Sequence, residues 1–474
     1  MTPGLTPGSH VHFVAICGVG MASLAGLLHS RGYKITGSDQ NVYPPMSHFL
    51  ADLGIAVSSG YRKENIQGRP DLVIIGNAVS RDNPEAQAVL EKEIPYMSLA
   101  QALSRFLIGS NKSIVVAGTH GKTTTASLMA WVSTQAGWDP SFFIGGIPLN
   151  FGSGFGQGNG GWVVIEGDEY DTAFFDKGPK FLHYKPDSVI LTSVEFDHAD
   201  IYRDLDHLKG AFRKLVDLIP SSGILLAFWG YEAVKEVCRD AAARVISYGI
   251  PGADWAAEVI KVQGNKTSFE VFHDGRSDGT LEISLVGRHN VMNALAVYAL
   301  GKELGIERAV LVQALATFAG VRRRQEHKGT VGGITLIDDF AHHPTAIKET
   351  IAAIRAAYPG QRLWAIFEPR SQTSRRRIFA AEFARALAAA DFAVVAGLYQ
   401  PEKIPLEDRL SCSEVVAEIN RQGAGRAVLI EKAADIAAHV SAQARAGDVI
   451  LVMSNGGFDG LQDKILQLLK ARHE

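Results

Sequence analysis

The sequence predicts an α/β protein with three domains and largely parallel sheets. Short apolar runs alternate with helical patterns along nearly the whole chain, which is typical of sheets layered with helices. This alternation restarts three times. A length of 474 residues also fits about three domains of roughly 150 residues each. We therefore expect domains over residues 1–109, 110–322 and 323–474.

The expected strands are the apolar runs of each domain. In the first domain they are VHFVAI, YKITGS, IAVSS and LVIIGN, followed by a linker at 108–113. In the second they are SIVVAG, GWVVIEG, DSVILTSV and GILLAF, with irregular β structure over 254–286. In the third they are ITLIDDF, RLWAIFE, FAVVAG and DVILVMS. The glycine-rich segment 150–161 is expected to be a mobile surface loop.

The composition narrows the class of protein. Hydrophobic residues make up 46% and charged residues 20%, as in ordinary globular domains, and the net charge of −3 offers no field for nucleic acid or anionic lipid. The three cysteines are far apart, which argues against a zinc site or disulfides and for a reducing cytoplasm. Neither a signal peptide nor a membrane span is predicted. The basic run 375–377 is expected to be a solvated helix start.

The stretch AGTHGKTTT, residues 117–125, predicts a phosphate-binding loop. It follows an apolar strand and leads into a helical pattern from about Thr124, so backbone N–H groups would point at a phosphate. Lys122 would neutralise the β- and γ-phosphates of ATP, and the Thr123 hydroxyl would ligate Mg²⁺. The residues expected to contact the nucleotide are Gly118, Thr119, His120, Gly121, Lys122, Thr123 and Thr124. The two glycines are separated by two residues rather than four, and the alternative is a plain turn with an exposed lysine.

Acidic residues follow two of the predicted strands in the second domain. VVIEGDEYD places Glu166, Asp168, Glu169 and Asp171 after one strand, and VEFDHAD places Glu195, Asp197, His198 and Asp200 after another. The carboxyl ends of strands face the crevice where open sheets bind ligands. Oxygen and imidazole ligands near a triphosphate indicate Mg²⁺, although each residue alone could be a solvated loop charge.

Two further motifs carry polar side chains that could reach a ligand. Asn290 and Asn293 are three residues apart on one face of a predicted helix and could hold an adenine edge or a ribose, whereas helix capping by Asn290 is the alternative. In IDDFAHHPTAI, Asp338 and Asp339 end a strand, and His342 follows in the turn before a helix. Arginines in GVRRRQE and FEPRSQTS can hold phosphate or carboxylate.

The first domain has a glycine loop of its own, CGVGMASLAG. Gly18 and Gly20 begin a G-x-G-x-x-G-like pattern that has serine at its last position. Asp39, preceded by Ser38, stands where a ribose-binding acid is expected. This pattern indicates a nucleotide diphosphate, either a dinucleotide or a nucleotide sugar.

Taken in order, these motifs resemble the Mur ligase family, the ATP-dependent enzymes that build the peptide of bacterial cell-wall precursors. The resemblance rests on GTHGKTTT, EGDE, EFDHAD, HNVMN, RRR and DDFAHHP, and it covers nearly the whole chain. It implies a Rossmann-like N-terminal domain for a UDP-sugar, a P-loop central ATPase domain and a Rossmann-like C-terminal domain for the incoming amine. ATP and Mg²⁺ are the implied cofactors.

Within the family, the glycine loop and GSD resemble the branch that uses UDP-N-acetylmuramate. VIIGNAVSRDNPE, FEPRSQT and VMSNGGF further resemble members that join the recycled murein tripeptide, L-alanyl-γ-D-glutamyl-meso-diaminopimelate, to that sugar. Thr373 and Phe340 stand where the L-alanine-adding relative has arginine and tyrosine, and we interpret both as favouring a larger acceptor. The L-alanine-adding activity is the alternative within the family. A monomer or weak dimer is expected.

The resemblance also implies roles for individual residues. Lys122 and Thr123 serve ATP and Mg²⁺, and Glu166 and His198 resemble the carboxylate and imidazole of the metal site. The ATP-side residues are Asn290, Asn293, Arg324 and Asp339, with the member of the run Arg322–Arg324 left open. His342 and Arg370 resemble positions that face the incoming amine, and His342 or Asp339 would help to deprotonate it. Gly18, Gly20, Ser38 and Asp39 would bind the UDP-sugar.

Two other classes of protein remain as alternatives to a ligase. A dinucleotide-dependent oxidoreductase would explain the first glycine loop but not the P-loop or the acidic strand ends. A non-catalytic nucleotide switch would need no residues that face an amine. ATP binding without NAD binding would exclude the first, and an effect of Arg370→Ala on turnover would exclude the second.

Overall fold

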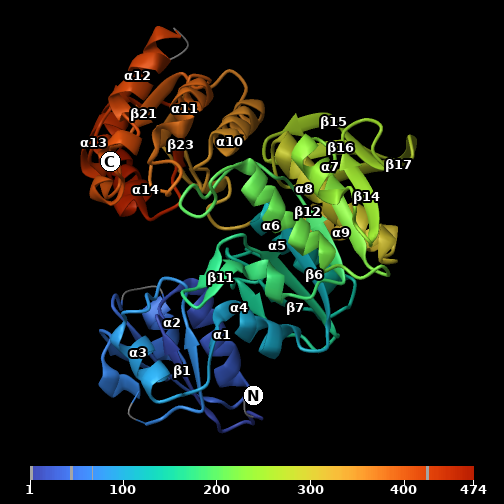
Figure 1. Cartoon of the computed structure of the whole chain (residues 1–474). Helices are drawn as coiled ribbons and strands as arrows, with labels where there is room; N and C mark the ends of the chain where they lie inside the picture. Colours follow the sequence, from blue (N-terminus) through green and yellow to red (C-terminus); the bar gives the residue numbers. More distant parts are fainter. Residues whose placement is uncertain (1–3, 43–45, 67, 423–425, 474) are drawn as a thin grey trace. The chain divides into compact units, whose positions relative to one another are not determined.

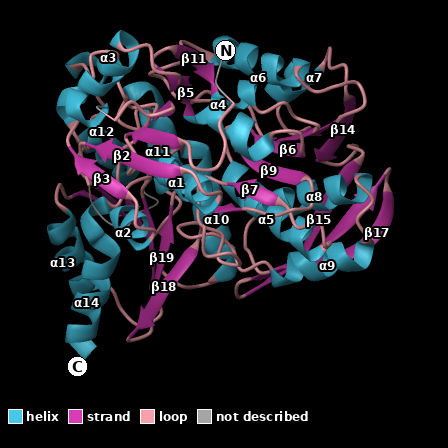
Figure 2. Cartoon of the chain, turned by 90° about the horizontal axis from the view of Figure 1, so that it is seen from below, coloured by secondary structure: helices cyan, strands magenta, loops and turns pink. Residues whose placement is uncertain are grey.

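The computed structural model describes residues 4–42, 46–66, 68–422 and 426–473. The chain forms two compact units, coloured along the sequence in Figure 1. The first unit takes in residues 1–147, 151–194 and 206–247, and the second takes in 148–150, 195–205 and 248–474. Both contain helices and strands, drawn cyan and magenta in Figure 2.

The first unit begins with a parallel sheet of five strands in the order β3-β2-β1-β4-β5. Their bounds are β1 His10–Val14, β2 Lys34–Asp39, β3 Ala56–Ser59, β4 Leu72–Ile75 and β5 Tyr96–Ser98. The helices of this region are α1 Val19–Ser30, α2 Met46–Asp52, α3 Pro84–Glu91 and α4 Leu99–Leu103. Parallel strands joined by helices confirm the α/β prediction here. β5 was not predicted, since it has only three residues.

A second sheet in the same unit carries the P-loop. Strands β13, β12, β6, β9, β7 and β8 follow one another in that order, and all neighbours are parallel except β7 and β8. Their bounds are β6 Lys112–Ala117, β7 Ser141–Phe143, β8 Phe155–Gly156, β9 Trp162–Gly167, β12 Ser188–Leu191 and β13 Ile224–Phe228. Strands β10 Asp171–Ala173 and β11 Asp176–Pro179 form a separate hairpin. The helices are α5 Lys122–Gln135, α6 Leu205–Asp217 and α7 Glu232–Cys238.

Two local expectations in this region need correction. Helix α5 begins at Lys122 rather than near Thr124, because Gly121 adopts the left-handed conformation that starts the helix directly after the loop. The glycine-rich segment 150–161 includes strand β8, and a Cβ on Gly158 or Gly160 would collide with the backbone of Asp139 or Trp138. These two glycines therefore permit close backbone approach.

The second unit begins with antiparallel strands. The end of β14 Arg244–Gly249 pairs in parallel with β15 Trp255–Gln263, and β15, β16 Lys266–His273 and β17 Arg276–Ile283 form an antiparallel meander. The region expected to be irregular is thus regular sheet with two bulges. Helices α8 Arg288–Glu303 and α9 Arg308–Thr317 follow.

The C-terminal part of the second unit is a doubly wound sheet in the order β18-β19-β23-β20-β21-β22. All neighbours are parallel except β18 and β19. The strands are β18 Glu326–Val331, β19 Ile334–Asp339, β20 Leu363–Phe367, β21 Phe392–Val395, β22 Arg426–Leu429 and β23 Val449–Met453. The helices are α10 Pro344–Ala357, α11 Ala380–Leu387, α12 Cys412–Arg421, α13 Ala433–Gln443 and α14 Leu461–His473.

Two apolar layers cover this sheet. Helices α10, α11 and α12 pack on one face, and α13 and α14 pack on the other. Because both faces are buried, the central strands are continuous apolar runs, as in LWAIF and VILVM. This burial explains why the sequence predicted these strands correctly.

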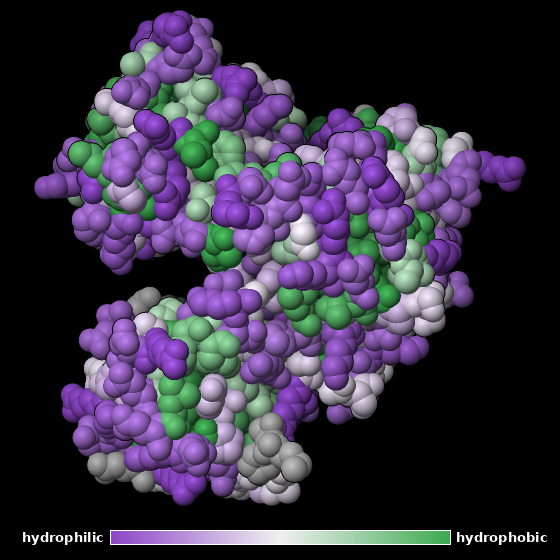
Figure 3. Space-filling model, viewed as in Figure 1, coloured by the Kyte–Doolittle hydropathy of each residue, from purple (hydrophilic) through white to green (hydrophobic). Residues whose placement is uncertain are grey.

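On the face shown in Figure 3, hydrophilic residues predominate and hydrophobic ones are interspersed among them. Among the described residues, no helix combines the length and apolar character needed to cross a membrane. The expectation that the basic run is solvated is wrong for Arg375, which is only 4% exposed.

Candidate functional site

The predicted P-loop folds as a tight turn between β6 and α5. Gly118 and Gly121 both have positive φ, 131° and 80°, and a Cβ on Gly118 would collide with the Thr192 hydroxyl and the backbone of Ser193. The amides of Thr119 and His120 donate to the backbone oxygen and the hydroxyl of Ser193, at 3.1 and 2.9 Å. The loop therefore lies directly on the end of β12, because β12 is the parallel neighbour of β6.

Lys122 is the central cation of this loop. Its ammonium donates to both oxygens of Glu169 at 3.0 and 2.8 Å and to the carbonyl oxygen of Gly118 at 2.6 Å. Burial lowers the pKa of Lys122, but Glu169, Asp168 and Glu166 outweigh this effect, so that the pKa is raised above its ordinary value. Lys122 is thus firmly protonated and suited to an anionic ligand.

Thr123 and Glu166 are brought together as predicted. The Thr123 hydroxyl donates to Glu166 Oε1 at 3.0 Å, and the Gly145 amide donates to Oε2 at 2.7 Å. A hydroxyl and a carboxylate beside the loop are hard oxygen ligands of the kind that Mg²⁺ prefers, so this pair fits the implied ion. Thr124 is buried in the first turn of α5.

The first glycine loop lies at the carboxyl end of β1. Gly18 is the N-cap of α1 and Gly20 lies in its first turn. Asp39, predicted to bind a ribose, accepts the amide of Cys17 at 2.9 Å with one oxygen and the amide of Asn41 at 3.0 Å with the other. Asp39 therefore fixes the shape of the loop in this structure.

Sequence reasoning missed Glu85, which lies behind this loop and is fully buried. The Ser38 hydroxyl, the Asn65 amide group and the Arg62 backbone N–H donate to its carboxylate, and His12 Nε2 is 3.5 Å away. Burial raises the pKa of Glu85, but these donors together lower it below its ordinary value. A glutamate directly after the Asn-Pro helix start, where its side chain faces the sheet, was the available signal.

In the second unit, Asp197 is at the centre of a buried polar group. It is 3% exposed, its Oδ1 accepts the His198 amide at 2.7 Å, and its Oδ2 is 3.9 Å from His342 Nε2. Burial raises the pKa of Asp197, but His198, His342 and His343 together lower it strongly. Burial lowers the pKa of His342, which favours its neutral form. His198, a predicted metal ligand, has the left-handed φ of 55°.

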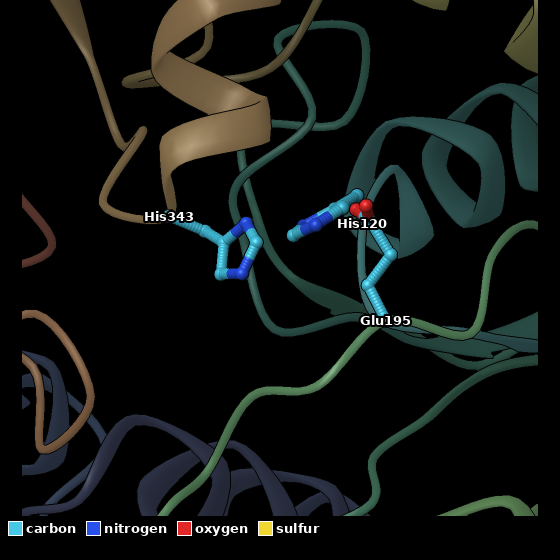
Figure 4. Close-up of side chains that lie close together, drawn as sticks. All are labelled: His120, Glu195 and His343. Atoms are coloured by element: carbon cyan, nitrogen blue, oxygen red, sulfur yellow. The ribbon is translucent and has the colours of Figure 1, made fainter. Parts of the chain in front are cut away.

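Glu195 and His343 belong to the same neighbourhood (Figure 4). The Thr345 hydroxyl donates to Glu195 Oε1 at 3.2 Å, and His343 Nε2 is 3.3 Å from the carbonyl oxygen of Phe196. His343 also caps α10 by accepting the Thr345 amide. His120, also drawn there, belongs to the P-loop of the first unit.

Asp339 organises the arginine-rich turn before β18. It accepts the amides of Gln325 and Ala341, both at 2.8 Å. Arg323 donates to Asp338 at 3.2 Å and to the Ser454 carbonyl oxygen at 2.7 Å. Through these contacts Arg323 stabilises the fold.

The other two arginines of the run differ from Arg323. The Arg324 guanidinium carbon lies 4.5 Å from the centre of the Phe340 ring, whereas Arg322 is exposed. The Arg323 guanidinium carbon lies over the same ring, 5.4 Å from its centre, so this contact does not choose between the two. Burial raises the pKa of Asp339 even though Arg324 opposes the shift.

The predicted pair Asn290 and Asn293 lies on one face of α8, and both residues are buried. Asn293 Nδ2 donates to Asn290 Oδ1 at 3.3 Å, and Asn290 Nδ2 donates to the Val286 carbonyl oxygen at 2.9 Å and to Gln325 Oε1 at 3.3 Å. The α8 pair therefore meets the arginine-rich turn through Gln325. No side-chain cap by Asn290 is formed, since Gly287 is the N-cap.

Arg370 follows β20 and lies apart from the histidine turn in the sequence. Its guanidinium carbon is 3.7 Å from the centre of the Tyr399 ring, and Nη1 is 3.5 Å from Glu368 Oε1. Thr373, three residues later, is 3% exposed and accepts the Ala199 amide at 3.4 Å; its hydroxyl also hydrogen-bonds to Asp197. The segment 368–373 thus joins the Asp197 group.

Comparisons with known proteins agree along the chain. Three family models match in order: "Mur ligase family, catalytic domain" at 10–110, "Mur ligase middle domain" at 116–301, and "Mur ligase, glutamate ligase domain" at 323–456. The UDP-N-acetylmuramate–L-alanyl-γ-D-glutamyl-meso-2,6-diaminoheptandioate ligase of Escherichia coli is 42% identical over 98% of this chain and 99% of its own.

Two solved structures are similar over the same extent. A murein peptide ligase from Psychrobacter arcticus is 36% identical with a TM-score of 0.73, and a UDP-N-acetylmuramate–alanine ligase from Thermotoga maritima is 26% identical with a TM-score of 0.81. Both comparisons cover 98% of this chain and 99% of the other. With three domain models in order and 42% identity over nearly its full length, the chain belongs to the Mur ligase family.

Proposed function

We propose that this protein is an ATP-dependent ligase that joins L-alanyl-γ-D-glutamyl-meso-diaminopimelate to UDP-N-acetylmuramate in cell-wall peptide recycling. The observation that carries the proposal is the P-loop, where Lys122 is held by Glu169 and Thr123 meets Glu166. The 42% identity to a ligase named for these two substrates supports the choice of donor and acceptor.

The two structural comparisons differ in the acceptor that they favour. The alanine ligase has the higher TM-score, 0.81 against 0.73, but the murein peptide ligase has the higher identity, 36% against 26%. A TM-score compares whole backbones, whereas the acceptor is chosen by side chains. We therefore follow the identity, which also agrees with threonine at position 373 and phenylalanine at position 340.

The chemistry has to activate a carboxylate, because its oxygen is a poor leaving group at neutral pH. In the proposed reaction, the lactyl carboxylate of the sugar displaces ADP from the γ-phosphorus of ATP and becomes an acyl phosphate. Lys122 would offset the repulsion between the carboxylate and the triphosphate. Thr123, Glu166 and His198 would hold Mg²⁺, which supplies further positive charge at the phosphates.

The second stage forms the amide. The amine of the tripeptide attacks the acyl carbon, inorganic phosphate leaves, and the amine loses a proton. The neutral form of His342 favoured by its lowered pKa can accept that proton, with Asp339 as the alternative. Asn290, Asn293 and Arg324 are assigned to ATP, and Arg370 is assigned to the acceptor.

The division of labour between domains is part of the proposal. Residues 1–109 would bind the UDP-sugar through Gly18, Gly20, Ser38 and Asp39, residues 110–322 would bind ATP, and residues 323–474 would bind the peptide. The three cysteines are free, which suits a reducing cytoplasm, and a monomer or weak dimer is proposed.

A phosphate-release assay tests the proposed function. The purified protein is given ATP, Mg²⁺ and UDP-N-acetylmuramate, with either the tripeptide or L-alanine as acceptor. We expect phosphate release and a new amide product with the tripeptide, and much slower release with L-alanine. A preference for L-alanine would reassign the acceptor, and ATP hydrolysis that is independent of both substrates would refute ligation altogether.

A further inference from the structure

Arg370, assigned above to the acceptor, is held in a clamp formed by Tyr399 and Gly456. One face of its guanidinium lies on the Tyr399 ring, with the carbon 3.7 Å from the ring centre. At Gly456, a Cβ would collide with Nε, Cδ and Cζ of Arg370. The arginine side chain therefore contacts both the Tyr399 ring and Gly456, where a side chain would fit only if Arg370 moved.

The clamp is anchored by a second arginine beneath it. Arg375 is 4% exposed and donates through Nη1 to the carbonyl oxygens of Tyr399 and Gln400, both at 3.0 Å. On the other side, the Ser374 hydroxyl accepts the Arg370 amide at 3.0 Å. Hydrogen bonds thus hold the backbone of both Tyr399 and Arg370, the two residues whose side chains stack.

Glu368 balances part of the charge. It is 7% exposed, the Ser454 hydroxyl donates to its Oε2, and Oε1 is 3.5 Å from Arg370 Nη1. This distance is at the long limit of a hydrogen bond, and 26% of the Arg370 side chain is exposed. A stacked guanidinium makes its strong hydrogen bonds in the plane of the group, where it matches a carboxylate bidentately.

The clamp lies where an open sheet binds ligands. Glu368 follows β20, Ser454 follows β23, and Tyr399 follows β21, and these three strands are parallel neighbours. Their carboxyl ends therefore converge on one edge of the C-terminal sheet. Asp339 ends β19, the other neighbour of β23, and the Ser454 amide donates to its carbonyl oxygen at 3.1 Å.

We propose that Tyr399 and Gly456 position Arg370 to bind one carboxylate of the acceptor, the free α-carboxylate of its γ-linked D-glutamyl residue. This inference rests on the proposed function. In the tripeptide, the carboxyl group beside the reacting amine is already used in a peptide bond. The first free carboxylate along the chain is the glutamyl α-carboxylate, because that residue is linked through its γ-carboxyl group.

A comparison of two substrates between the wild-type protein and its variants tests the clamp. The substrates are the tripeptide and its D-isoglutaminyl analogue, in which the glutamyl α-carboxylate is an amide. For the wild-type protein, kcat/KM is expected to fall by about 10- to 100-fold with the analogue, because a charge-assisted bidentate pair is lost. In Tyr399→Ala, KM for the tripeptide is expected to rise about 10-fold, and the preference for the carboxylate is expected to shrink to a few-fold.

Matched variants separate positioning from a loss of folding. Tyr399→Phe keeps the ring and is expected to restore the preference for the carboxylate. Leu406→Ala, at a position that is 76% exposed, is expected to change nothing. In Gly456→Ala the new methyl group would displace Arg370, and the carboxylate preference is expected to fall as in Tyr399→Ala. KM for UDP-N-acetylmuramate and ATP is expected to stay within about two-fold throughout, which a general folding defect would not allow.

Three results would overturn the inference. One is a wild-type protein that ligates both peptides equally well. Another is Tyr399→Ala with an unchanged preference for the carboxylate. The third is a preference that follows the diaminopimelate side-chain carboxylate, seen as a loss with the lysine-containing tripeptide and none with the isoglutaminyl analogue. If the wild-type protein ligates no peptide at all, the proposed function fails instead.

Discussion

The P-loop and the Asp197–His342 neighbourhood were reached from the sequence in different ways. The P-loop is one continuous stretch, and its contacts join residues that lie in it or at the ends of the adjacent strands β9 and β12. The second neighbourhood draws on separate segments around residues 197, 325, 342 and 373. A local motif thus predicts its own geometry, whereas an assembled site is predicted residue by residue and its partners are found only in the fold.

The largest expected effect concerns the P-loop, which was predicted from one continuous stretch of sequence. Lys122→Ala removes the cation of the loop and is expected to lower kcat/KM by about 1,000-fold, because the lysine proposed to offset the charge of the triphosphate is lost. Calorimetry should show unchanged binding of UDP-N-acetylmuramate. Lys235→Ala, which removes a lysine paired on a surface helix, is the control. Retained ligation in Lys122→Ala would contradict the P-loop assignment.

Glu166→Gln tests whether the local pair with Thr123 serves an ion. The substitution keeps the shape but removes the negative charge, so the Mg²⁺ concentration for half-maximal activity is expected to rise at least about 10-fold and kcat to fall about 100-fold. A titration of activity with MgCl₂ measures both. An unchanged Mg²⁺ requirement would mean that this carboxylate only orients Thr123 and Gly145.

Asp39→Asn tests whether the first glycine loop needs Asp39, which lies outside the loop in the sequence, to bind the UDP-sugar. Its two oxygens accept the amides of Cys17 and Asn41, and an amide side chain can accept only one of them. KM for UDP-N-acetylmuramate is expected to rise about 10-fold, with kcat and the KM for ATP little changed. Steady-state kinetics with each substrate varied in turn would show a different pattern if Asp39 served the chemical step.

Glu85→Gln should affect stability more than turnover. The folded pKa of Glu85 is lowered, so its contribution to stability is present above the ordinary glutamate pKa of about 4.3 and is lost as the pH falls through the lowered value. The variant is expected to lose about 1–3 kcal/mol of stability at pH 7. Thermal unfolding at pH 7 and at pH 4 measures this loss, and the gap between the two proteins should narrow at pH 4. An equal gap at both values would show that the charge is not involved.

The residues that the sequence failed to predict as buried are charged, whereas the apolar strands were predicted correctly. The sequence predicted the apolar strands of the C-terminal sheet because both faces are covered and leave a continuous apolar run. It did not reveal Glu85 or Arg375, whose residue types are usually exposed, because their burial depends on donors or acceptors from distant segments. Arg375 was in fact expected to be solvated.

The sequence by itself determined the α/β class, the family, and the residue types of the predicted phosphate loop, because strand periodicity and such a loop are encoded in neighbouring positions. The tertiary structure alone decided that Arg323 pairs with Asp338, that Asp39 shapes its loop, and that Tyr399 and Gly456 contact Arg370. These contacts join residues far apart in the chain. Their partners are set by which strands become neighbours in a sheet, which no local pattern specifies.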